Sequence, residues 1–191
     1  MATPLPVEGQ IIDGTFRVES RLGSGAAGTA FMVTLTRAWA GRESGTAFCL
    51  KWYKDDVFDW EAAPNVVARR VREATIGGSL DHPNLVRVYD TSEFWAGGTP
   101  HYLLMDLIRG ETLDKLVARG PVESERVHQI LLDTASGLKA LHDKGLVHRD
   151  VKAANVMVGP DGHAVVLDLG VVRPDTEETV TDTRGFLVSV R

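Results

Sequence analysis

The sequence predicts an α+β fold in two parts, an antiparallel sheet with one main helix followed by a mostly helical region. Strand-like patterns fill the segment from Thr15 to Tyr53, and a first helical pattern begins near Pro64. The longest helical pattern, Glu123–Lys144, lies in the second half. A chain of 191 residues suits one domain, or two small lobes around one cleft.

The strands are predicted from residue type and periodicity. Residues Phe16–Leu22 alternate apolar and polar side chains, which is the pattern of a half-buried strand. Ala30–Thr36 and Thr46–Tyr53 are rich in β-branched and aromatic residues, with a turn at Gly41–Gly45 between them. Two more strands complete a predicted five-stranded antiparallel sheet: Leu85–Tyr89 and Tyr102–Met105.

Two helices are predicted from apolar spacing. The first begins at Pro64, a residue suited to a first helical turn, and we expect Gly77-Gly78 to end it. Its residues spaced three or four apart share one face: Val66, Arg70, Glu73, Gly77 and Leu80. The second, Glu123–Lys144, precedes a C-cap glycine at Gly145. Its side chains predict one broad apolar stripe: Val127, Ile130, Leu131, Ala135, Leu138 and Leu141.

Short strand-like runs and a polar tail follow the long helix. The runs are Leu146-Val147, Asn155–Val158 and Ala164–Asp168, and the last two are separated by a turn at Pro160-Asp161-Gly162. The segment from Arg173 is polar and rich in threonine, so it is predicted to be a loop.

Composition limits the class of protein. With 43% hydrophobic and 25% charged residues the chain is an ordinary globular one, and its net charge of −5 argues against a general nucleic-acid binder. Met1–Gln10 lacks the positive charge of a secretory signal, and no apolar run approaches the ~20 residues that cross a bilayer. Cys49 is the single cysteine and fits a reducing compartment. We expect a cytoplasmic protein without a membrane or nucleic-acid partner.

A G-x-G-x-x-G motif consists of Gly23, Gly25 and Gly28. Its backbone N–H groups can approach a phosphate, but glycines also make plain hairpins. A dinucleotide site, and with it an oxidoreductase, requires a helix after the glycines. Here a strand-like segment follows, which favours a hairpin flap over phosphates.

Two charged residues can extend such a phosphate site. Lys51 lies within a predicted strand, and its ammonium would pair with phosphate oxygens if it faced the glycines. Glu73 on the next helix is a candidate to hold that ammonium in place. The alternatives are an exposed strand lysine and a solvated helix charge.

The strongest chemical signal is the polar segment His148–Asn155 between two apolar runs. Such a cluster is costly unless its members are paired or functional. Asp150 can orient a hydroxyl nucleophile, Lys152 can contact a phosphate, and Asn155 is a neutral oxygen ligand for Mg²⁺. Asp168 ends an apolar strand and can face a cleft to hold a metal, although a strand-end cap is the alternative.

In this order the motifs resemble the eukaryotic-like protein kinase family, and in style its bacterial Ser/Thr branch. The resemblance covers Phe16 to Arg191. It implies a bilobal kinase fold with a complete N-lobe, residues 1–105, and an incomplete, mostly helical C-lobe, residues 106–191. The implied activity is transfer of the ATP γ-phosphoryl group to Ser/Thr hydroxyls of proteins, with Mg²⁺.

The resemblance also implies a role for each motif residue. Asp150 would be the catalytic base and Lys152 the γ-phosphate contact, with Asn155 and Asp168 as Mg²⁺ ligands. The implied ATP-binding residues are Gly23, Gly25, Gly28, Lys51, Glu73, the gatekeeper Met105 and the hinge Asp106 to Ile108. Thr181 and Thr183 are candidate phosphorylation sites. The sequence departs from the family at Cys49, Ala30 and Leu169, where Ala, Val and Phe are usual.

The resemblance ends before the family's A-P-E motif and its later helices. Losing the partners of four Leu-sized side chains would cost about 6–12 kcal/mol, against a domain stability of about 5–15 kcal/mol. We therefore expect a marginal chain that self-associates or binds a partner chain over its exposed C-lobe. The alternative function is a catalytically weak nucleotide-binding module that needs such a partner.

Overall fold

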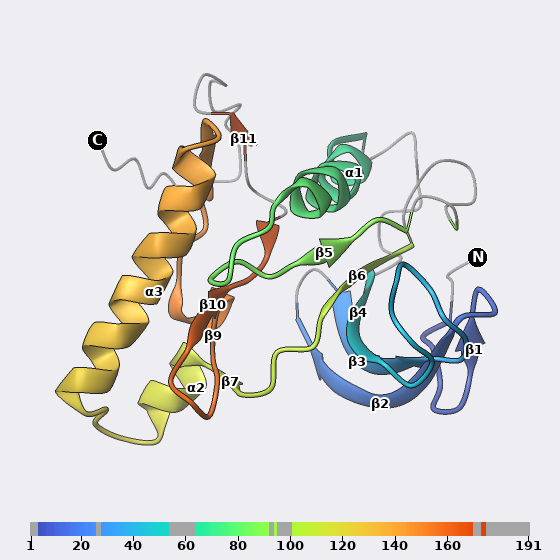
Figure 1. Ribbon diagram of the computed structural model, residues 1–191, viewed down its shortest axis with the longest axis horizontal. Helices are drawn as coiled ribbons and strands as arrows, with labels where there is room; N and C mark the ends of the chain where they lie inside the picture. The colour runs from blue at the N-terminus through green and yellow to red at the C-terminus, as the bar shows by residue number, and fades with distance from the viewer. Residues whose placement is uncertain are drawn as a thin grey trace.

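The protein is described from a computed structural model covering residues 4–25, 28–53, 64–91, 94, 101–169 and 173–174. It has two parts (Figure 1). A curved sheet with helix α1 forms one part, and helix α3 with several short strands forms the other. Within the described residues, no helix combines the length and the apolar character needed to cross a membrane.

The first part is built on one antiparallel sheet in the order β1-β2-β3-β4-β6-β5. Its strands are β1 (Ile11–Ile12), β2 (Phe16–Ser24), β3 (Gly28–Leu35), β4 (Ala47–Tyr53), β5 (Val88–Tyr89) and β6 (Tyr102–Asp106). All five predicted strands are present, but the sheet has six strands rather than the predicted five, because β1 was not predicted. Two residues of β1 are too few to show a periodicity. Strand β5 begins only at Val88, because Leu85 instead forms a single bridge with Val166.

Helix α1 (Pro64–Ser79) starts where the proline predicts but continues through the two glycines expected to end it. Tight packing explains why a glycine lies inside the helix. A Cβ at Gly77 would lie 2.6 Å from a methyl carbon of Val88, so glycine lets α1 pack closely on β5. The predicted inner face is confirmed where side chains are described, because Arg70, Glu73 and Leu80 are all buried.

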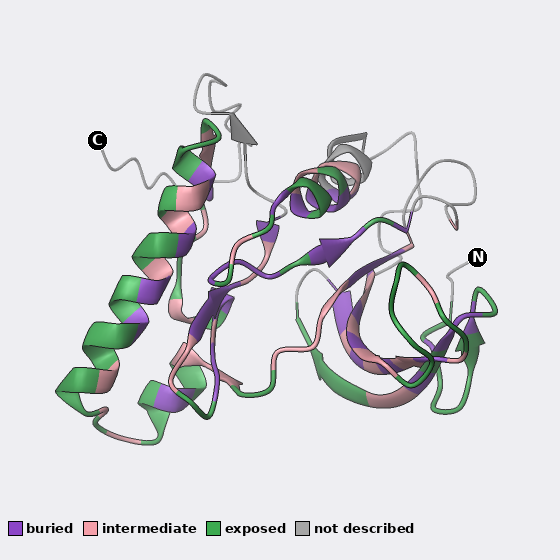
Figure 2. Ribbon diagram, viewed as in Figure 1, coloured by how far each residue is buried: buried purple, intermediate pink, exposed green. Residues whose placement is uncertain are grey.

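The sheet's core is aromatic. Phe16, Phe48 and Leu104 are almost completely buried. Trp39 packs edge-on against Phe16 at 5.3 Å between ring centroids, and Phe48 packs edge-on against Tyr89 at 5.0 Å. These side chains belong to one cluster of buried residues from the sheet, and Figure 2 colours buried residues along its strands purple.

The second part joins small sheets to two helices. β7 (Glu111–Thr112) leads into α2 (Leu113–Ala118), and α3 (Ser124–His142) follows. Sheet β10-β9-β7 and the pair β11-β8 complete it, with β8 (Leu146–Val147), the 3-10 turn η3 (Ala153–Asn155), β9 (Val156–Val158), β10 (Ala164–Val166) and β11 (Arg173–Pro174). The prediction of a loop at Arg173 is wrong at its start, because β11 pairs with β8.

Helix α3 is confirmed, and Gly145 adopts the left-handed φ of +68° expected of a C-cap glycine. The prediction of one broad buried apolar stripe along α3 is wrong. Ile130 and Leu141 are buried, but Leu131 is 61% exposed and Val127 is 40% exposed. The physical reason is that the described elements packed on α3, chiefly β10 and β8, cover only one side of it.

Candidate active site

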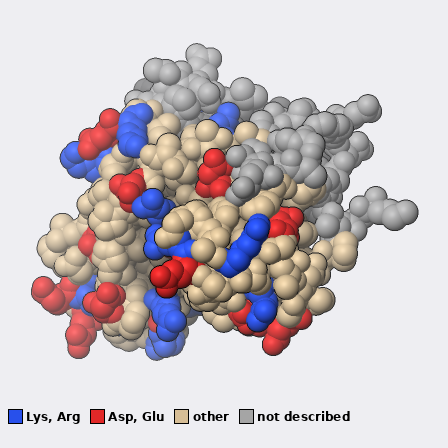
Figure 3. All heavy atoms as spheres, turned by 45° about the vertical axis from the view of Figure 1, so that its right-hand side comes forward, with Lys and Arg blue, Asp and Glu red and all other residues tan. Residues whose placement is uncertain are grey.

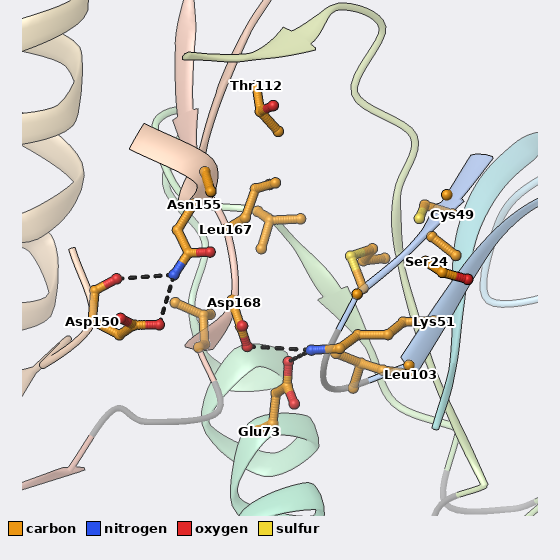
Figure 4. A pocket seen from close by; sticks show the side chains of 18 of the residues that line it. Ser24, Cys49, Lys51, Glu73, Leu103, Thr112, Asp150, Asn155, Leu167 and Asp168 are labelled. Atoms are coloured by element: carbon orange, nitrogen blue, oxygen red, sulfur yellow. Dashed lines mark hydrogen bonds and ion pairs between the residues drawn. The ribbon is translucent and has the colours of Figure 1, made fainter. Parts of the chain in front are cut away.

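A cavity of about 860 Å³ lies between the two parts. Of the predicted site residues, these line it: Gly23, Gly25, Gly28, Lys51, Glu73, Met105, Asp150, Lys152, Asn155 and Asp168. They come from β2 and the residue after it, β3, β4, α1, β6 and the segment from β8 to the residues just after β10. Figure 4 labels Lys51, Glu73, Asp150, Asn155 and Asp168 among them. On the molecular face in Figure 3, acidic and basic side chains are interspersed, so neither sign of charge dominates it.

Lys51 is held by two carboxylates. Its Nζ donates to Glu73 Oε1 at 2.8 Å and to Asp168 Oδ1 at 3.2 Å. Burial opposes the charged ammonium, but Glu73 and then Asp168 outweigh it and raise the pKa of Lys51. The ammonium therefore stays charged in the cavity. Because the side chains of Lys51 and Glu73 are only 15% and 4% exposed, the alternatives of an exposed strand lysine and a solvated Glu73 are ruled out.

The three glycines of the motif lie where β2 and β3 meet: Gly23 in β2, Gly25 directly after it and Gly28 at the start of β3. The Gly25 N–H donates to the Gly28 carbonyl at 2.8 Å. A Cβ at Gly28 would lie 2.3 Å from the Trp52 carbonyl oxygen, so glycine is required where this hairpin meets β4. Gly23 and Gly25 have no such neighbour. Because strand β3 follows the glycines, the dinucleotide-binding arrangement is excluded.

Asp150 lies across the cavity at the centre of a small hydrogen-bond network. Lys152 Nζ donates to Asp150 Oδ2 at 2.7 Å. Asn155 Nδ2 donates to the same oxygen at 3.0 Å and to the Asp150 carbonyl at 2.9 Å. Figure 4 marks the two hydrogen bonds between Asn155 and Asp150. The Asp150 side chain is 35% exposed. The carboxylate is thus fixed in orientation and still open to the cavity.

His148 anchors this loop to the strand before Asp168. It is 1% exposed, its Nδ1 accepts the Asp150 N–H at 3.3 Å, and its Nε2 lies 2.9 Å from the Leu167 carbonyl. Arg149 and Asp168 have positive φ angles of 64° and 57°. Such conformations cost about 1–3 kcal/mol each and cluster at functional sites. The polar segment is therefore both internally paired and locally strained.

The remaining predicted residues lie elsewhere. Asp106 and Ile108 are not among the residues lining the cavity. The Asp106 carboxylate instead accepts the Tyr89 hydroxyl at 2.7 Å, and Ile108 packs against the core beneath α3. Their implied role is through backbone groups, which stays a prediction. Thr181 and Thr183 lie outside the described residues.

Sequence reasoning missed several cavity residues, among them the polar residues Tyr53, Arg70, Thr112, Asp114 and Lys115. Strand alternation could have found Tyr53, which lies two residues after Lys51 on the same face. Helical spacing placed Arg70 on the face of Glu73 without assigning it a role. The other three follow from β7 and α2, elements too short for a periodic signal.

The described residues hold no group of three or more His, Cys, Asp or Glu side chains placed to bind a metal ion. Asn155 and Asp168 nevertheless suit Mg²⁺, because proteins usually bind this ion through one or two carboxylates together with substrate phosphates. Asn155 fits as a neutral ligand, because its Nδ2 is engaged by Asp150 and its Oδ1 is the atom left to accept a cation. Asp168 supplies the carboxylate from the neighbouring backbone, because the Leu167 N–H donates to the Asn155 carbonyl at 2.8 Å.

Comparison with known protein families identifies the class to which this fold belongs. The protein kinase domain model matches residues 16–187. The chain belongs to the protein kinase family.

Several similar curated proteins are bacterial. The chain is 33% identical over 180 residues to the serine/threonine-protein kinase pkn2 of Myxococcus xanthus, covering 90% of this chain and 20% of that protein. It is 37% identical over 128 residues to the serine/threonine-protein kinase PknB of Mycolicibacterium smegmatis, covering 65% and 20%. A probable PknB of Corynebacterium glutamicum is 32% identical over 183 residues, covering 93% and 26%. The chain thus spans about a fifth to a quarter of these relatives.

Proposed function

We propose that this chain binds Mg-ATP and transfers its γ-phosphoryl group to Ser or Thr hydroxyls of proteins. The observation that carries the proposal is the arrangement of charge across one cavity. A lysine held by two carboxylates faces a carboxylate that a second lysine and an asparagine hold in place. The lobes are residues 1–105 and 106–191, with the nucleotide between them.

The glycine hairpin and Lys51 bind the phosphates. The absence of Cβ atoms at Gly23 and Gly25 lets backbone N–H groups approach phosphate oxygens. Lys51, fixed by Glu73, pairs with the α- and β-phosphates as a charged donor. Catalysis of this kind consists of positioning and charge neutralisation rather than covalent chemistry by the protein.

Asn155 and Asp168 hold Mg²⁺. When bound, the ion neutralises charge on the phosphate oxygens and fixes their orientation. Asp168 also accepts from Lys51, so one carboxylate connects the cation site with the phosphate-binding lysine.

Asp150 orients the attacking hydroxyl and accepts its proton, and Lys152 contacts the transferred phosphoryl group. The proposal is supported by the hydrogen bonds that Asp150 Oδ2 accepts from Lys152 and Asn155, which fix the carboxylate. Its partial exposure leaves room for a substrate hydroxyl.

The adenine ring fits the apolar side of the cavity. Met105, Cys49 and Ala30 line this side. The resemblance to kinases supports backbone groups of Asp106 to Ile108 as the hydrogen-bonding partners of the ring, although Asp106 and Ile108 do not themselves line the cavity. A cysteine where the family usually has alanine narrows this end of the pocket.

The choice of Ser/Thr hydroxyls is supported by the names of the relatives. It is also supported by Lys152, which resembles the Ser/Thr branch of the family, because tyrosine kinases usually replace this lysine. The same likeness supports proteins as the substrates. It also supports Thr181 and Thr183 of this chain as sites of phosphorylation. ATP and the single free thiol, Cys49, favour the cytoplasm.

The alternative, a weak nucleotide-binding module that needs a partner chain, is favoured by one observation. Val127, Leu131 and Leu132 expose apolar side chains on one side of α3. The same face supports self-association, which sedimentation velocity over a range of protein concentrations measures.

A direct experiment is incubation with Mg-ATP and a Ser/Thr-rich protein such as casein, followed by mass spectrometric mapping of phosphate. We expect phosphoserine or phosphothreonine with the wild type and a loss of at least a hundredfold with Asp150→Asn. Mg-ATP binding without transfer would favour the alternative. Absence of both would refute the proposal.

A further inference from the structure

Tyr53 is the last residue of β4 and lies two residues after Lys51, so its side chain is on the same face of the strand. It is 3% exposed, and its hydroxyl donates to Glu73 Oε2 at 3.2 Å. This hydrogen bond connects β4 with α1, and the function proposed above does not use it.

The two oxygens of Glu73 thus have different partners. Oε1 accepts from Lys51 at 2.8 Å and Oε2 accepts from Tyr53. The terminal torsion of a glutamate is otherwise broad, so a single hydrogen bond would leave the carboxylate free to rotate. Two donors from one strand fix its plane, and a buried carboxylate oxygen without a donor would be costly.

A side chain of helix α1 also contacts the Tyr53 ring. The guanidinium of Arg70, one turn before Glu73, lies 4.6 Å from the ring centroid, and Arg70 is 5% exposed. Burial, followed by the nearby Glu73 charge, holds the pKa of Tyr53 well above its usual value. The hydroxyl therefore keeps its proton and remains a donor at neutral pH.

We propose that Tyr53 is a positioning residue that fixes the Glu73 carboxylate, and with it helix α1, in the orientation that holds Lys51 for the nucleotide. This deepens the proposed function and rests on it for its effect on activity. Tyr53 acts through Glu73, so its hydroxyl contributes only while Glu73 can accept from it.

The test is Tyr53→Phe, which removes one oxygen atom and keeps the ring. Tyr102→Phe is the matched control, because Tyr102 is also buried and donates to a carboxylate, Asp13 Oδ2, at 2.6 Å outside the cavity lining. We expect kcat/KM for Mg-ATP to fall about tenfold in Tyr53→Phe, equivalent to about 1.4 kcal/mol. Tyr102→Phe should stay within about twofold of wild type.

A double-mutant cycle separates positioning from general destabilisation. Glu73→Ala removes the acceptor of the Tyr53 hydroxyl and lowers activity by itself, so adding Tyr53→Phe to it should change kcat/KM by less than about twofold, because coupled residues are not additive. If the fold-losses in kcat/KM of the two single variants instead multiplied in the double variant, the proposal would be overturned.

Amide hydrogen exchange without nucleotide gives a readout independent of activity. We expect faster exchange in α1, residues 64–79, in Tyr53→Phe and not in Tyr102→Phe. Exchange at the wild-type rate in Tyr53→Phe would overturn the proposal. If the wild type neither bound nor used Mg-ATP, the proposed function would fail, while the exchange result would still decide the role of Tyr53.

Discussion

Replacing Gly28 with alanine perturbs the point where the glycine hairpin meets the strand that carries Lys51. The added Cβ would lie 2.3 Å from the Trp52 carbonyl oxygen and 3.3 Å from the Tyr53 Cα. Both neighbours are backbone atoms of β4, which pairs with β3 in register Gly28↔Tyr53 and Thr29↔Trp52. No side chain can rotate to relieve the contact.

The size of the effect follows from the overlap. Ordinary contacts begin at 3.4 Å, so the two strands must separate by about 1 Å. Overpacking of this kind costs about 1–3 kcal/mol. For a chain of this length 1 kcal/mol shifts the midpoint of thermal unfolding by about 2–4 °C, so Tm should fall by about 2–12 °C.

Thermal unfolding followed by circular dichroism measures this shift, and Gly23→Ala is the matched control. Gly23 lies in the same hairpin, but a Cβ there meets nothing within 4 Å. Its Tm should stay within about 2 °C of wild type, since substitutions without such contacts change stability by about 0.5 kcal/mol or less. Equal Tm values for the two variants would refute the packing argument.

Three further outcomes are expected. Burial raises the pKa of Cys49 to about 11 from 9.0, so the folded chain binds more protons than the unfolded chain above pH 9, and its stability falls as pH rises toward 11. Denaturant unfolding at pH 8 and pH 11 should show wild type losing up to about 2.7 kcal/mol more than Cys49→Ala, and equal losses would contradict this. Leu141→Ala should lower the unfolding free energy by about 2–5 kcal/mol, because Leu141 is fully buried, whereas Leu131→Ala on the exposed face should change it by less than about 0.5 kcal/mol. Similar losses in both variants would mean that the face of α3 at Leu131 is covered. For the wild type, Mg-ATP at a concentration of about 100 times its dissociation constant should stabilise the folded state by about 2.7 kcal/mol and raise Tm accordingly. Lys51→Ala should remove most of this rise. An undiminished rise in Tm would contradict the assignment of Lys51.

The sequence was sufficient for the long elements and for the order of the site motifs. Strong alternation predicted β2, and helical spacing placed Arg70 and Glu73 on the buried face of α1. The pairing of Lys51 with Glu73 was predicted as a candidate contact and is present at 2.8 Å.

Other features depend on tertiary packing and could not be read from local pattern. Gly77 would break a solvent-exposed helix, yet it lies within α1 because Val88 packs against it. Leu131 fits the apolar spacing of α3 but faces away from β8 and β10. The second partner of Lys51, Asp168, lies 117 residues further along the chain, and no local rule connects them.

The central claim is that one cavity binds Mg-ATP and directs its γ-phosphoryl group to a hydroxyl. Incubation of wild type, Asp150→Asn and Asp168→Asn with ATP carrying ¹⁸O in its γ-phosphoryl group, followed by mass spectrometry of the acceptor protein, tests it most directly. The account predicts labelled phosphate on Ser or Thr with the wild type and almost none with either variant. Equal labelling by all three proteins, or no labelling by a wild type that binds Mg-ATP, would contradict it.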